Sequence, residues 1–126
     1  MIVVDASAAV AVLFREPDAK RVAPLLLTEK TIRVPQLFHL EIANVARTKV
    51  RRGEIDRRRA RVLLGTTSAW PLEQVAAPWE RLWPLAHTYG LTIYDAAYLW
   101  LARKSRCRLL TLDSALSIAA GRRAAP

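Results

Sequence analysis

The apolar positions of the chain alternate between short continuous runs and longer stretches with helical spacing. Residues 2–4 form a β-branched run that ends at Asp5, and an alanine-rich stretch follows directly over residues 6–14. β-branched runs favour strands and alanine favours helices, so the sequence predicts a buried strand that leads straight into a helix. The same succession of strand and helix recurs along the rest of the chain.

The remaining pattern predicts three more strands and six more helices. The strands are expected over residues 31–34, 72–75 and 108–112, and the helices over residues 17–27, 36–52, 55–64, 79–89, 92–103 and 114–120. Pro24 and Pro84 are expected to end or kink two of these helices, because proline lacks the N–H that a helix interior needs. Strands that alternate with helices predict a three-layer α/β/α domain with a small, mainly parallel central sheet flanked by helices.

The composition limits the possible function classes. A chain of 126 residues, 52% of them hydrophobic, has the material for a single domain over residues 1–126. The single cysteine, Cys107, excludes an intrachain disulfide and a zinc site built from several thiolates. The longest apolar run, residues 8–14, is too short to cross a membrane, and the first residues lack the features of a signal peptide, so a cytoplasmic location is expected.

The charge balance indicates a polyanionic partner. Lys and Arg number 20 against 11 Asp and Glu, which gives a net charge of +9 and favours contact with nucleic acid or an acidic protein. Much of the positive charge lies around the turn between the helices predicted at residues 36–52 and 55–64. A solvated helix face can carry such a cluster, but the excess of Arg over Lys favours bidentate contact with phosphate. The candidate nucleic-acid contacts are Arg47, Lys49, Arg51, Arg52, Arg57 and Arg58.

Four carboxylates lie among residues that favour burial. Asp5 and Asp113 each follow a predicted strand, Asp95 lies near the start of a predicted helix, and Glu41 lies inside the helix predicted at residues 36–52. For any one of the aspartates taken alone, capping of a helix is the better interpretation. Glu41 is expected in the middle of its helix, where no backbone N–H is free, so it needs a partner from elsewhere in the fold.

The predicted topology brings Asp5 and Asp113 to one crevice. The carboxyl ends of neighbouring parallel strands open onto the same edge of a sheet, and Asp95 can join them there. Converging carboxylates either acquire raised pKa values or bind a cation, and hard oxygen ligands select Mg²⁺ or Mn²⁺. Such ions act on phosphates. A basic protein with an acidic metal pocket has the properties of a nuclease.

The acidic residues lie in segments that resemble a known family. The segments are residues 3–8 (VVDASA), 35–37 (PQL), 40–45 (LEIANV), 91–99 (LTIYDAAYL) and 110–113 (LTLD). Their order and spacing resemble the PIN domain, and more closely the VapC toxins of bacterial and archaeal toxin–antitoxin systems. The resemblance covers nearly the whole chain, although Pro84 interrupts a helix that is usually continuous in the family.

The resemblance implies an Mg²⁺- or Mn²⁺-dependent endoribonuclease, the toxin of a type II toxin–antitoxin pair, that cleaves RNA with metal-activated water. The family's acidic metal-binding residues correspond to Asp5, Glu41, Asp95 and Asp113, with Asp5 and Asp95 as principal ligands. Ser7 and Asn44 correspond to a hydroxyl and an amide expected to orient the carboxylates or water. The resemblance also implies a homodimer and inhibition by a cognate VapB-type antitoxin.

A different class of function stays open at this point. The chain could be a catalytically silent PIN-like module that binds nucleic acid or protein and uses its acidic residues only as helix caps. The presence of all four carboxylates favours the enzyme, because a degenerate copy is expected to lose some of them. Binding of a divalent ion discriminates between the two hypotheses.

Overall fold

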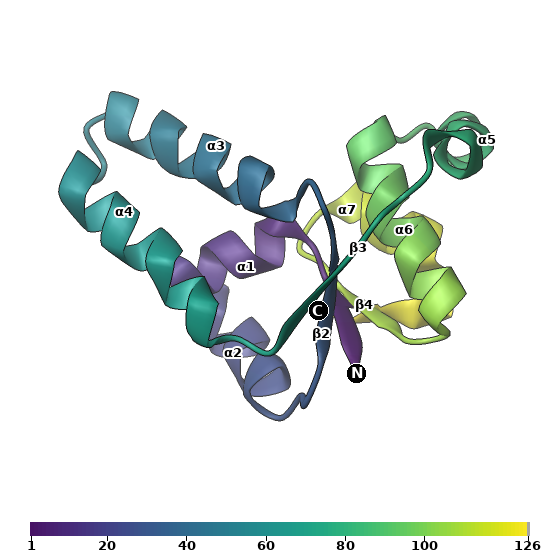
Figure 1. Ribbon diagram of the computed structural model, residues 1–126, viewed down its shortest axis with the longest axis horizontal. Coiled ribbons are helices and arrows are strands. Elements are labelled where there is room, and N and C mark those ends of the chain that lie inside the picture. Colours follow the sequence, from purple (N-terminus) through teal and green to yellow (C-terminus); the bar gives the residue numbers. More distant parts are fainter. Residues whose placement is uncertain (126) are drawn as a thin grey trace.

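The architecture is a parallel sheet between two layers of helices. The computed structural model describes residues 1–125 (Figure 1). The strands are β1 (Ile2–Val4), β2 (Ile32–Pro35), β3 (Leu72–Val75), β4 (Arg108–Leu110) and β5 (Ala124–Ala125), and they pair in the order β3-β2-β1-β4-β5. Every neighbouring pair is parallel. The predicted fold class is therefore confirmed.

Seven α-helices cover the two faces of the sheet. They are α1 (Ala6–Leu13), α2 (Ala19–Leu27), α3 (Phe38–Arg51), α4 (Arg57–Gly65), α5 (Trp79–Tyr89), α6 (Ile93–Ser105) and α7 (Ser114–Ala120), with short 3₁₀ turns at Thr66–Ala69 and Gly121–Arg123. Figure 1 shows α1 to α4 on one side of the strands and α5 to α7 on the other. Helices α3 and α4 pack against each other and extend away from the sheet as an arm.

The core explains why the central strands carry almost no polar residues. All residues of β1 are buried, and Leu109 and Leu110 of β4 are buried as well. A strand between two helical layers has apolar neighbours on both faces, so its sequence is a continuous apolar run and does not alternate between apolar and polar residues. Helix α6 contributes six buried residues to the core, among them Tyr98 and Leu99.

The order of the strands creates one crevice at the carboxyl edge of the sheet. The chain leaves β1, adds β2 and then β3 on one side, and returns through α5 and α6 to place β4 on the other side of β1. The direction of growth therefore reverses between β1 and β4. In open parallel sheets, functional sites lie outside the carboxyl ends of the strands at such a switch point.

Neither proline ends its helix. Pro24 lies within α2 and Pro84 within α5, and both helices continue past the proline. The prediction that these residues end their helices was wrong: both prolines are exposed, so water can reach the backbone carbonyls that lose a helical donor. Strand β4 ends at Leu110, earlier than predicted, and the two-alanine strand β5 had no β-branched signal in the sequence. Within the described chain, none of the helices combines the length and the apolar character needed to span a membrane.

Candidate active site

Asp5 stands at the carboxyl end of β1 and caps α1. Its Oδ1 accepts hydrogen bonds from the Ala8 N–H (3.0 Å) and the Ser7 hydroxyl (2.7 Å), and its Oδ2 accepts one from the Thr111 hydroxyl (2.7 Å). The side chain is 3% exposed. Burial raises the pKa of the Asp5 carboxyl, the three hydrogen bonds oppose that rise, and the charge of Asp95 adds to it. Capping explains one of the three contacts, and the other two bind Asp5 to a wider network.

The turn between β4 and α7 is tied to Asp5 through two hydroxyl groups. The Leu112 N–H donates to Ser7 Oγ (3.0 Å) and the Asp113 N–H donates to Thr111 Oγ1 (3.0 Å). Each hydroxyl therefore accepts from this turn and donates to one oxygen of Asp5. Asp113 caps α7 by accepting from the Leu116 N–H (2.8 Å). Asp5 is therefore connected to the backbone of the turn that carries Asp113 through the hydroxyls of Ser7 and Thr111.

Asp95 lies in the first turn of α6, the helix that Thr92 caps. The Asp95 N–H donates to Thr92 Oγ1 (3.0 Å). Burial raises the pKa of the Asp95 carboxyl, the negative charge of Asp113 raises it further, and hydrogen bonding with Thr92 opposes the rise. The capping role therefore belongs to Thr92, and the Asp95 carboxylate is influenced by the charge on the neighbouring turn.

Glu41 lies in the first turn of α3, not in the middle of the helix as the sequence predicted. The helix begins at Phe38, two residues later than expected. Glu41 nevertheless takes its hydrogen bond from another element, because the Tyr98 hydroxyl of α6 donates to Glu41 Oε1 at 2.7 Å. Burial raises the pKa of the Glu41 carboxyl, Tyr98 opposes the rise, and the charges of Asp95 and Asp5 add to it.

The four carboxylates share one electrostatic environment, yet they do not form a finished coordination shell. Like charges among them raise the pKa values of Asp5, Glu41 and Asp95. Among residues 1–125, however, no three acidic, histidine or cysteine side chains lie close enough together to hold a metal ion as they stand. In donor type and in charge the carboxylates fit a hard divalent cation, which would relieve their repulsion.

Ser7 and Asn44 differ in how the structure places them. Ser7 contacts Asp5 directly, as described above. Asn44 is exposed and lines a groove beside Glu41, whose other walls include Leu40 and Tyr94. The predicted neighbourhood of Asn44 and Glu41 on one helix face is present, but no side-chain hydrogen bond joins Asn44 to another of residues 1–125.

The sequence interpretation missed three residues of this site. Tyr98, Thr111 and Thr92 contact Glu41, Asp5 and Asp95 respectively. Thr92 could have been found from the spacing Thr-x-x-Asp, which is typical of a helix N-terminus. Tyr98 and Thr111 sit among apolar residues that pattern analysis assigns to the core, and no local signal distinguishes them from packing residues.

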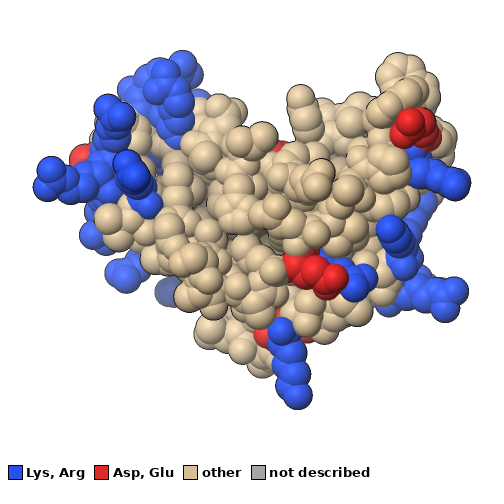
Figure 2. Space-filling model, viewed as in Figure 1, with Lys and Arg blue, Asp and Glu red and all other residues tan. Residues whose placement is uncertain are grey.

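One group of basic residues lies on the arm formed by α3 and α4. Figure 2 shows Lys and Arg side chains over the outer ends of these two helices and a second set along the opposite edge of the molecule, whereas the upper middle of the same face carries almost no charge. Arg47, Arg51, Arg52, Arg57 and Arg58 are all exposed, and none of them forms an ion pair with another residue of the described chain. These five are free to contact a polyanion.

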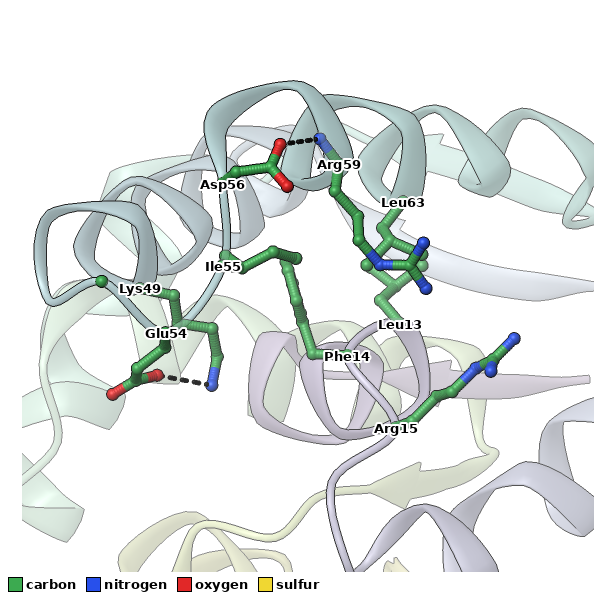
Figure 3. Close-up of a pocket in the computed structure, with 10 residues that line it drawn as sticks. Leu13, Phe14, Arg15, Lys49, Glu54, Ile55, Asp56, Arg59 and Leu63 are labelled. Carbon is green, nitrogen blue, oxygen red and sulfur yellow. Dashed lines mark hydrogen bonds and ion pairs between the residues drawn. The ribbon is translucent and has the colours of Figure 1, made fainter.

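Lys49 differs from the other basic candidates because it is engaged within the protein. Its Nζ lies 2.8 Å from Glu16 Oε1 and 3.4 Å from Glu54 Oε2. Figure 3 shows Lys49 turned towards Glu54 in a cavity of about 580 Å³ at the outer end of the arm, close to Phe14 and Ile55. The ion pairs raise the pKa of the Lys49 ammonium. Lys49 therefore ties α3 to the end of α1.

Replacing Lys49 by Met is expected to lower the melting temperature. A partly exposed ion pair contributes about 1 kcal/mol, which corresponds to a fall of roughly 3–5 °C in a chain of this size. Arg51→Met, on the same helix, is the matched control and should leave the melting temperature unchanged, because Arg51 forms no ion pair within residues 1–125. Thermal unfolding of both variants measures the difference. If Lys49→Met melts at the same temperature as the wild type, the Lys49 ion pairs contribute nothing to stability.

A family model and two relatives match most of this chain. The family model of the PIN domain matches residues 2–122. Ribonuclease VapC9 of Mycobacterium tuberculosis is 34% identical over 119 residues, which cover 93% of this chain and 89% of that protein. Ribonuclease VapC3 of Pyrobaculum aerophilum is 31% identical over 120 residues, covering 92% of each chain.

Solved structures share the fold. The crystal structure of PAE2754 from Pyrobaculum aerophilum superposes with a TM-score of 0.77 and 24% identity, covering 98% of this chain and 81% of that one. The structure of Mycobacterium tuberculosis VapC20, described as a Sarcin-Ricin loop cleaving toxin, gives a TM-score of 0.76 at 16% identity over the full length of both chains. From the matching family model and the relatives above 30% identity, the chain belongs to the PIN domain family, and within it to the VapC-type ribonucleases.

Proposed function

We propose that this protein is an Mg²⁺- or Mn²⁺-dependent endoribonuclease that acts as the toxin of a type II toxin–antitoxin pair. One observation carries the proposal: four carboxylates from four separate elements lie at the switch point of the sheet, where burial and, to a smaller extent, the charges of their neighbours raise the pKa values of three of them. Keeping several charges together in this way is costly unless a cation or a reaction uses them. The ribonuclease names of the relatives support RNA as the substrate.

The four carboxylates are the residues that would hold the ion. Asp5 and Asp95 would be its principal ligands, and Glu41 and Asp113 would hold it through water or complete a second metal position. A divalent cation supplies Lewis-acid polarisation of the scissile phosphate and makes the attacking water more acidic. The chain's own part is to orient the carboxylates: Ser7 and Thr111 each hold one oxygen of Asp5.

Asn44 has a different proposed part. Its exposed amide lies one helical turn after Glu41 in the groove beside that carboxylate. From this position its amide can donate a hydrogen bond to a water or a substrate oxygen beside Glu41.

Addition of Mn²⁺ is expected to raise the melting temperature of the protein. A ligand that binds only the folded state stabilises it by mass action, and at a hundredfold excess over the Kd the gain is about 2.7 kcal/mol, or roughly 10 °C here. The rise should be absent in Asp95→Asn and present in Glu73→Gln, an acidic-residue control in the edge strand β3. Thermal unfolding across a Mn²⁺ titration measures it. A wild-type protein that shows no rise at any Mn²⁺ concentration would favour the catalytically silent module.

Contact with RNA is proposed for the exposed arginines of the arm. Substituting Arg51 and Arg58 by Glu is expected to weaken RNA binding at least tenfold. The slope of the logarithm of the RNA association constant against the logarithm of the salt concentration should become shallower by about 0.7 for each lost phosphate contact. The matched control replaces Lys30 and Arg108 by Glu. Both residues are exposed near the amino ends of β2 and β4, at the edge of the sheet opposite the carboxylates. Equal weakening by both double variants would assign the effect to net charge alone.

The partners follow from the same proposal. A cognate VapB-type antitoxin is proposed to inhibit the enzyme, and the free arginines of the arm suit an acidic segment of such a partner. The protein is proposed to form a homodimer, as the resemblance to VapC toxins implies. It is proposed to act in the cytoplasm, where its RNA substrate is found.

A further inference from the structure

One hydrogen bond crosses from one helical layer to the other at the acidic site. The Tyr98 hydroxyl of α6 donates to Glu41 Oε1 of α3 at 2.7 Å, and the two residues are 57 positions apart in the chain. Helices α3 and α6 lie on opposite sides of the strands (Figure 1). This contact is the direct polar link between the two layers at Glu41, and it involves one of the four proposed metal-binding carboxylates.

The hydroxyl of Tyr98 is not needed for packing. The side chain is 1% exposed and surrounded by apolar core residues, where a phenylalanine ring would fill almost the same volume. A phenol hydroxyl at such a depth is costly unless it finds a partner. Among residues 1–125 no buried side-chain polar atom lacks a hydrogen bond, and Tyr98 meets this condition through Glu41.

The Glu41 side chain needs a hydrogen-bond donor to hold its carboxylate at the site. Its side chain has three rotatable bonds, and the negative charges of Asp95 and Asp5 repel it from the site. Without a donor, this repulsion favours a rotamer in which the carboxylate turns towards solvent. A donor anchored in the core holds one oxygen in place against the repulsion.

We propose that Tyr98 is a positioning residue, whose hydroxyl holds Glu41 Oε1 and so presents Glu41 Oε2 to the ion and substrate. The inference rests on the proposed function and adds a residue to it. Tyr98 does not touch RNA, because its side chain is buried. Its effect is therefore expected on ion binding and on the rate of cleavage, and not on the affinity for RNA.

The test compares two tyrosine-to-phenylalanine variants. Tyr98→Phe is expected to lower Mn²⁺ affinity and kcat by about 10- to 100-fold, the range typical of residues that orient a metal ligand, with KM for RNA unchanged. Tyr89→Phe is the matched control: it also loses a hydroxyl contact, to Arg103 Nη2 at 2.7 Å, but it lies at the end of α5. Calorimetric Mn²⁺ titration and single-turnover cleavage measure the two effects, and thermal unfolding shows that both variants are folded.

A double-mutant cycle separates positioning from a general effect on the fold. In a Glu41→Ala background, Tyr98→Phe is expected to cause no further loss of Mn²⁺ affinity, because the hydroxyl then has no carboxylate to hold. If the double variant instead loses Mn²⁺ affinity by the product of the two single-variant factors, Tyr98 acts independently of Glu41 and the inference is wrong.

The outcomes distinguish this inference from the proposed function. If wild-type protein binds Mn²⁺ and cleaves RNA while Tyr98→Phe does both equally well, the positioning role is wrong and the proposed function stands. If wild-type protein neither binds Mn²⁺ nor cleaves RNA, the proposed function fails and the positioning role fails with it.

Discussion

Substituting Asp5 by Asn is expected to reduce RNA cleavage about a thousandfold or more while leaving the protein folded. The amide keeps an oxygen for the Ala8 N–H and the Ser7 hydroxyl and nearly the same volume, so the cap of α1 is retained, but its NH₂ group cannot accept from the Thr111 hydroxyl. The substitution removes the negative charge that a divalent ion requires. A thousandfold reduction in the cleavage rate corresponds to a loss of about 4 kcal/mol of transition-state stabilisation.

Two opposing effects act on the stability of the Asp5 variant. Burial raises the pKa of Asp5 in the folded protein above its unfolded value, so the ionised carboxylate opposes folding at neutral pH, and a neutral amide removes that penalty. The amide also loses the hydrogen bond from the Thr111 hydroxyl, so the melting temperature in metal-free buffer should stay close to that of wild type. Such a combination of lost activity and retained stability is typical of a functional residue held at a cost to the fold.

Asp56→Asn is the control for this experiment. Asp56 caps α4 as Asp5 caps α1, with its Oδ1 accepting from the Arg59 N–H at 2.9 Å (Figure 3), but it lies where α4 begins, at the outer end of the arm. Cleavage of a defined RNA and thermal unfolding of both variants are the measurements. If Asp5→Asn cleaves as fast as Asp56→Asn, the carboxylate of Asp5 is only a helix cap and the metal mechanism is wrong.

Removal of divalent ions with EDTA is expected to abolish RNA cleavage and to leave the fold intact. Packing of the apolar strands between two helical layers stabilises the domain without a metal, and the acidic residues have hydrogen bonds within the protein. Excess Mg²⁺ or Mn²⁺ should restore cleavage fully. Ca²⁺, which binds more oxygen ligands at longer distances and in a less regular geometry, should restore it poorly.

The same experiment needs a readout of structure. Circular dichroism before and after EDTA should show unchanged helix content, and the melting temperature should fall only by the amount that Mn²⁺ addition restores. Persistent cleavage in EDTA by protein freed of contaminating nuclease would contradict the metal dependence. The Asp5→Asn variant, purified in parallel, reports contamination because it shares every preparation step.

The layers of the fold and four of the five strands in residues 1–125 followed from the sequence alone. Residues 2–4 are a continuous apolar run followed directly by Asp5, and Leu109 and Leu110 precede Asp113 by a few residues; both aspartates stand at a helix start. A parallel sheet places the residues that follow its strands at one edge. This local rule predicted that Asp5 and Asp113 lie near each other, and the structure joins Asp5 to the Asp113 backbone N–H through the Thr111 hydroxyl.

Only the tertiary structure decided which polar residues act together. The partner of Glu41 is Tyr98, 57 residues away, and Lys49 differs from Arg51 only because Glu16 and Glu54 lie within reach of its ammonium group. Residue type and spacing describe a side chain's immediate neighbours along one element. Contacts between elements depend on how two helices approach each other, which is set by the packing of the whole core and leaves no signal in a local pattern.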